Sequence, residues 1–130
     1  MKTFNLHKCI ARGLRLLKEG GNTRRSISNA KILFSNMELD RATLYLEDSC
    51  NCRLHTEWSG SDGFQDILFT HDFTGLSAGY CGEGSRGLIE VLRLFNIPCT
   101  RNNVFTLKPG VYRLFKVGEE PVKILTRVFA

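Results

Sequence analysis

Two neighbouring segments of alternating side chains place the strongest constraint on the fold of this chain. In the second segment, residues 52–58, one face is formed by Cys52, Leu54, Thr56 and Trp58. The opposite face is formed by Arg53, His55 and Glu57. Residues 42–47 alternate in the same way, and strict alternation is typical of strands with one buried face. Residues 48–51, Asp-Ser-Cys-Asn, have turn composition, so the two segments predict a β-hairpin.

The remaining patterns add further strands and two helices. Apolar residues recur at helical spacing over residues 6–18 and again from Ser85, which can cap a helix, to Phe95. Residues 26–40 fit either a strand or a short helix. Further strands are predicted, separated by turn residues, at 64–70, 104–107, 111–117 and 122–129.

These elements predict a single domain over residues 1–130. Because strands and helices do not alternate regularly, we expect an α+β fold with a mainly antiparallel sheet of about five to six strands, packed with two main helices. The apolar runs are far shorter than the ~20 residues of a membrane span, and the N-terminus does not resemble a signal peptide, so a cytoplasmic location is expected. Five cysteines at irregular spacing predict free thiols in a reducing compartment.

Residues 75–87 form a glycine-rich stretch between a predicted strand and a predicted helix. Five glycines within thirteen residues permit close backbone approach, and the first turn of a helix offers free N–H groups. Together they predict a site for an anion, with Arg86 adding a bidentate contact to phosphate and an aromatic ring stacking on a base. The predicted ligand-binding residues are Gly79, Tyr80, Gly82, Gly84, Ser85, Arg86 and Phe73. The alternative is that the glycines only allow a tight crossing against the sheet.

This stretch partly matches two nucleotide-binding motifs but lacks residues that each motif requires. Residues 82–87 match G-x-G-x-x-G, yet Arg101, Asn102 and Asn103 stand about twenty residues on, where the dinucleotide-binding fold has an acidic residue. Ser85 and Arg86 stand where a P-loop requires Lys and then Ser or Thr. Neither a Rossmann domain nor a P-loop NTPase is therefore predicted.

Catalytic and metal sites have weaker support. Cys81 precedes a helix start, where a thiolate is favoured, and His71 or His55 is a candidate base, but no signature of a cysteine enzyme surrounds it. Cys50, Cys52 and His55 have metal-ligand chemistry, yet strand alternation sends Cys52 and His55 to opposite faces. We therefore predict no catalytic residues, no metal and no cofactor, and an enzyme is the less favoured class.

Three functions remain open at this point. The preferred one is a non-catalytic binding module for a phosphorylated, nucleotide-like small molecule. The second is a small protein-binding module of the inhibitor or immunity type, using exposed aromatic and arginine side chains as anchors. The third is nucleic-acid binding by a basic face, which carries Lys8, Arg12, Arg15, Arg24 and Arg25. Membrane partners are not expected, and a homo-oligomer is left open.

Overall fold

The computed structural model of the protein describes residues 16–48, 50–61 and 64–118. In chain order the elements are α2 (Thr23–Asn36), β1 (Glu38–Asp48), β2 (Asn51–Ser61), β3 (Asp66–Phe73), α3 (Glu83–Leu94), α4 (Arg101–Phe105) and β4 (Gly110–Leu114). The strands form one antiparallel sheet in the order β3-β2-β1-β4. The predicted α+β class is confirmed, with four strands in the part of the chain described.

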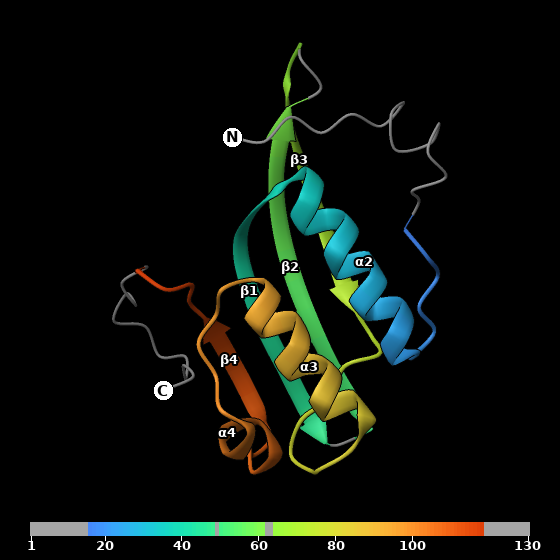
Figure 1. The fold of residues 1–130 in the computed structure, drawn as a ribbon, viewed down its shortest axis with the longest axis vertical. Helices are drawn as coiled ribbons and strands as arrows, with labels where there is room; N and C mark the ends of the chain where they lie inside the picture. The colour runs from blue at the N-terminus through green and yellow to red at the C-terminus, as the bar shows by residue number, and fades with distance from the viewer. Residues whose placement is uncertain (1–15, 49, 62–63, 119–130) are drawn as a thin grey trace.

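The long helices α2 and α3 lie side by side against one face of the sheet (Figure 1). On that face the side chains of β1 and β2 are mostly buried, and those of β3 are half-buried except for the buried Phe73. Most side chains on the opposite face are exposed or half-buried. The molecule therefore has two layers, with the core between the helices and the sheet.

The predicted hairpin is confirmed as β1 and β2, and both strands extend beyond the predicted segments. Leu44 pairs with Leu54, and Ala42 pairs with Thr56. The turn is stabilised by Asp48, whose Oδ1 accepts hydrogen bonds from the backbone N–H groups of Cys50 (2.7 Å) and Asn51 (2.9 Å). This is the Asx-type turn that the Asp-Ser-Cys-Asn sequence favours.

An aromatic cluster fills the centre of the core. Phe95 is fully buried in the cap position after α3. Its ring packs edge-on against Trp58 at 5.3 Å between ring centroids and stacks on Phe34 at 5.8 Å. Phe73 completes the cluster at 6.0 Å from Phe95. Because these rings come from α2, β2, β3 and the end of α3, the cluster joins the helical layer to the sheet.

The ambiguous residues 26–40 divide between two elements. They form most of α2 and then the first residues of β1, with a break at Met37. The helix begins after Asn22, whose side chain accepts a hydrogen bond from the N–H of Arg25 at 3.1 Å. Of the helix predicted over residues 6–18, only residues 16–18 are described, and they are not helical.

The predicted strand at residues 104–107 is wrong, because α4 covers Arg101–Phe105. Thr100 caps this short helix by accepting a hydrogen bond from the N–H of Asn103 at 3.1 Å. A local cap therefore outweighs the β-propensity of Val104 and Phe105. The predicted strand at 122–129 lies outside the described residues.

No helix in the described ranges is long and apolar enough to cross a membrane.

Candidate functional site

A pocket of about 460 Å³ opens between α3 and α4. It is lined by Cys81, Arg86, Ile89, Glu90, Arg93, Arg101 and Phe105. This volume falls within the range of roughly 300–1,000 Å³ that is typical of small-molecule sites. Its lining combines four charged side chains with the apolar side chains of Ile89 and Phe105.

Helical spacing explains why these side chains meet. Positions 86, 89, 90 and 93 follow the i, i+3, i+4, i+7 pattern, so they share one face of α3. Arg101 and Phe105 are four residues apart and share one face of α4. The opposite face of α3 is buried in the core, which fixes the polar stripe toward α4 and solvent.

Positive charge dominates the pocket. Arg86, Arg93 and Arg101 are exposed, and Glu90 is the carboxylate among the lining residues. The guanidinium Nη1 of Arg86 lies 4.0 Å from the Cys81 sulfur. Three planar guanidinium groups around one cavity favour an anion that accepts several hydrogen bonds.

The glycines of residues 75–87 serve close packing. A Cβ atom added at Gly84 would lie 2.9 Å from the Cβ of Ser77, and the Gly84 carbonyl accepts a hydrogen bond from the Ser77 N–H at 3.0 Å. A Cβ added at Gly82 would lie 2.1 Å from the ring of Tyr80. The space in front of these two glycines is thus filled by the loop itself.

The other predicted loop residues are divided between the surface and the core. Tyr80 is 41% exposed, and Gly79, which has a positive φ of 86°, donates its N–H to the Val104 carbonyl at 2.8 Å. Ser85 is fully buried, and its hydroxyl has no hydrogen-bond partner among the described residues. Arg86 reaches the pocket.

The structure contradicts the prediction that a nucleobase stacks on Phe73. Its side chain is fully buried in the aromatic core cluster, so it cannot meet a ligand without unfolding of the sheet edge. Alternation along β3 places Phe73 on the helix-facing side.

Sequence reasoning did not identify Arg93, Arg101 and Phe105 as site residues. The spacing of Arg86 and Arg93 on the predicted helix was a usable signal. Arg101 and Phe105 could not be assigned to the site from the sequence, because α4 itself was not predicted.

A buried carboxylate forms a second polar cluster away from the pocket. The Oε2 atom of Glu19 accepts hydrogen bonds from Asn29 Nδ2 at 2.8 Å and contacts His71 Nε2 at 2.5 Å. Its Oε1 atom accepts from Ser26 Oγ and from the Thr74 N–H at 2.9 Å. Burial by itself would raise the pKa of Glu19, but these hydrogen bonds outweigh it and lower the pKa from 4.5 to about 2.

Neither histidine considered as a base for Cys81 contacts that thiol in the described ranges. His71 is engaged with Glu19, and Nδ1 of His55 lies 2.6 Å from Oδ1 of Asp72 on the open sheet face. Burial raises the pKa of the Cys52 thiol to about 12, so this group stays protonated at neutral pH. No group of metal-ligating side chains is found among the residues that the structure describes.

The basic face proposed for nucleic acid is only partly described. Lys8, Arg12 and Arg15 lie outside the described residues. Arg24 and Arg25 are exposed at the start of α2, and Arg25 donates a hydrogen bond to the Lys18 carbonyl at 2.9 Å.

Comparison with known proteins adds no assignment: no family model, no curated protein and no solved structure matches this chain.

Proposed function

We propose that the protein is a non-catalytic binding module that holds a phosphorylated, nucleotide-like small molecule in the pocket between α3 and α4. The observation that carries the proposal is the convergence of Arg86, Arg93 and Arg101 on one pocket of about 460 Å³. Arginine suits phosphate because its planar donors match two phosphate oxygens at once.

The uncharged part of the pocket supports an organic ligand rather than a bare anion. Phe105 is half-buried and Ile89 is buried at 5% exposure, so both offer an apolar surface beside the arginines. A nucleobase or sugar ring covers such a surface well. Glu90 fits the same ligand class, because its carboxylate can accept a hydrogen bond from a ribose hydroxyl or an amino group.

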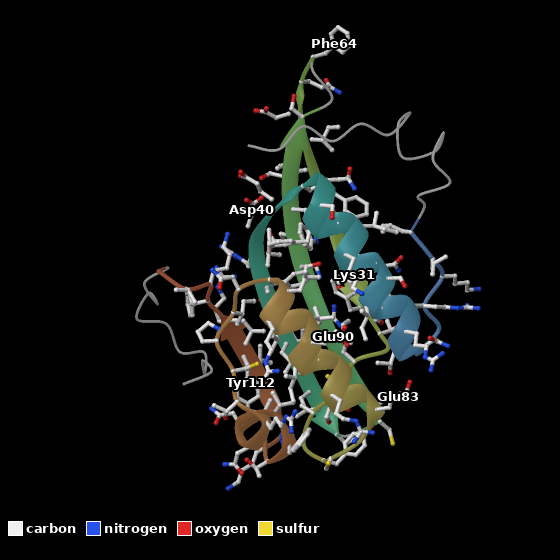
Figure 2. The ribbon with its side chains drawn as sticks, in the orientation of Figure 1. Lys31, Asp40, Phe64, Glu83, Glu90 and Tyr112 are labelled. Atoms are coloured by element: carbon white, nitrogen blue, oxygen red, sulfur yellow. The ribbon has the colours of Figure 1, made fainter. Side chains whose placement is uncertain are left out.

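This proposal places the phosphate on arginine side chains, whereas the sequence alone predicted that the N–H groups of the glycine-rich loop would bind it. Tyr80 fills the space in front of Gly82, and Glu83 brings negative charge to the first turn of α3. Figure 2 shows Glu83 at the N-terminal end of α3 and Glu90 further along the helix. We therefore assign the phosphate to the three arginines and keep Arg86 as the residue shared with the loop.

The proposal is tested by isothermal titration calorimetry with AMP, ATP and inorganic phosphate. Substitution Arg93→Ala or Arg101→Ala should weaken nucleotide binding by about 1.5–3 kcal/mol, or roughly 10- to 150-fold, the usual value of a hydrogen bond to a charged group. Arg41→Ala is the matched control: it removes the same charge from the open sheet face, where Arg41 pairs with Glu57 at 3.7 Å. Binding should be unchanged in this control.

Glu90→Gln separates a nucleotide site from a general anion site. It should weaken AMP binding while leaving phosphate binding equal or stronger, since a repulsive charge is removed. The proposal fails if neither nucleotide binds, or if Arg41→Ala weakens binding as much as Arg93→Ala does.

A further inference from the structure

The positive charge of the pocket between α3 and α4 is divided between its two ends. Arg86 and Arg93 are seven residues apart on α3, so about 10.5 Å of helix axis separates their backbones. Both side chains are exposed, and both line the pocket. Their other neighbours show that the two guanidinium groups lie toward opposite ends of it.

The first end of the pocket, the Arg86 end, lies beside the loop that precedes α3. The Nη1 atom of Arg86 is 4.0 Å from the sulfur of Cys81, which comes one residue before the cap residue Gly82. The Arg86 side chain therefore extends back past the start of the helix, in the direction that helical side chains favour.

The second end of the pocket, the Arg93 end, lies beside the segment that follows α3. Arg93 also lines a smaller hollow of about 190 Å³ together with Pro98 and Cys99. Burial raises the pKa of the Cys99 thiol, and the positive charge of Arg93 partly offsets this rise, so the guanidinium group lies near Cys99. Arg101 follows Cys99 by two residues, so their Cα atoms are at most about 7 Å apart. This end therefore holds two arginines.

The middle of the pocket is unsuited to phosphate. Ile89 and Glu90 lie three or four residues from each α3 arginine, about 4.5–6 Å along the helix axis. Ile89 is apolar, and the carboxylate of Glu90 repels an anion. A continuous chain of phosphates, as in ADP, would have to cross this middle to reach both ends. A sugar ring suits it better, because its hydroxyl groups can donate hydrogen bonds to Glu90.

We propose that the ligand is a nucleoside 3′,5′-bisphosphate, with one phosphate bound at each end of the pocket. One phosphate contacts Arg93 and Arg101, the other contacts Arg86, and the ribose between them faces Ile89 and Glu90. This inference rests on the proposed function and divides its three arginines between two phosphate groups. A nucleotide with a single phosphate binds at the Arg93 end, where two guanidinium groups offer more donors than one.

Isothermal titration calorimetry on the full chain compares adenosine 3′,5′-bisphosphate with ADP and AMP. ADP is the matched control ligand, because it has the same atoms and the same number of phosphates but joins the phosphates in one chain. The bisphosphate should bind at least about ten-fold more tightly than ADP or AMP. Only its second phosphate reaches Arg86 without passing Glu90, and one hydrogen bond to a charged group has at least this effect on affinity.

Arg86→Ala tests which end holds the second phosphate. It should weaken binding of the bisphosphate by at least about ten-fold and leave AMP binding unchanged, whereas Arg93→Ala should weaken the binding of both. Arg41→Ala, away from the pocket, should change neither affinity. Trp58 fluorescence confirms that each variant is folded, and the comparison of the three ligands on the unmodified chain does not depend on any variant.

The results separate this inference from the proposed function. If AMP binds and depends on Arg93, but the bisphosphate binds no more tightly than ADP, the proposed function stands and the two-ended ligand is wrong. The two-ended ligand is also wrong if Arg86→Ala weakens the binding of AMP and of the bisphosphate equally, or affects neither. If none of the three ligands binds, both proposals fail.

Discussion

Replacement of Glu19 by glutamine tests whether the buried carboxylate cluster holds the segment before α2 onto the sheet. The Glu19 side chain is 3% exposed, and its donors come from α2 (Ser26 and Asn29), from β3 (His71) and from Thr74. Glutamine keeps the shape of the side chain but removes its charge and part of its accepting capacity. The substitution therefore isolates the contribution of the carboxylate.

The magnitude follows from the shift in pKa. A pKa that falls from 4.5 in the unfolded chain to about 2 in the folded protein corresponds to at most about 3 kcal/mol, since one pKa unit is about 1.4 kcal/mol. Because the folded pKa is the lower one, this stability is fully present above pH 4.5. It is lost as the pH falls from 4.5 toward 2, where the carboxylate of the folded protein becomes protonated.

Urea denaturation between pH 2 and pH 7 measures this contribution, with the fluorescence of Trp58, the only tryptophan and 1% exposed, as the probe. The unmodified protein should lose about 3 kcal/mol more than Glu19→Gln over this range, because all other carboxylates titrate in both proteins. At pH 7, Glu19→Gln should be less stable by a similar amount.

Glu57→Gln is the control for a surface carboxylate. Its ion pair with Arg41 is 3.7 Å long and its side chain is 41% exposed, so its loss should cost less than about 1 kcal/mol. Parallel pH profiles for the unmodified protein and Glu19→Gln would refute the reasoning, because the carboxylate would then contribute nothing through its charged form.

Two further predictions concern the loop before α3 and the thiols. Gly84→Ala should lower the free energy of unfolding by about 1–3 kcal/mol, since the added Cβ would lie 2.9 Å from the Cβ of Ser77 and overpacking has this cost. Thermal unfolding followed by circular dichroism measures the change, and an unchanged melting temperature would show that the loop has room to move. At pH 8 the exposed Cys50 and Cys81 should react rapidly with iodoacetamide, whereas Cys52 should remain unmodified because burial raises its pKa to about 12. Mass mapping of the alkylated peptides measures the labelling, and early labelling of Cys52 would contradict this prediction.

Sequence patterns correctly predicted the elements that depend on interactions within a few residues. The hairpin of β1 and β2 follows from alternation over residues 52–58 and from an Asx turn at Asp48, both of which act within a few residues. The helix predicted from Ser85 to Phe95 corresponds to α3, which begins two residues earlier. Its buried stripe was visible at helical spacing.

Only the tertiary structure decided what those elements face. Arg86 and Arg93 meet Arg101 because α4 packs beside α3, and α4 itself depends on the Thr100 cap rather than on an apolar pattern. Glu19 shows the same limit, since its partners His71 and Thr74 lie 52 and 55 residues further along the chain. Periodicity reports which face of an element is buried, but not which distant element covers it. The sequence therefore determined the β1–β2 hairpin, its turn and the helix α3, whereas packing between distant segments decided the pocket and the carboxylate cluster.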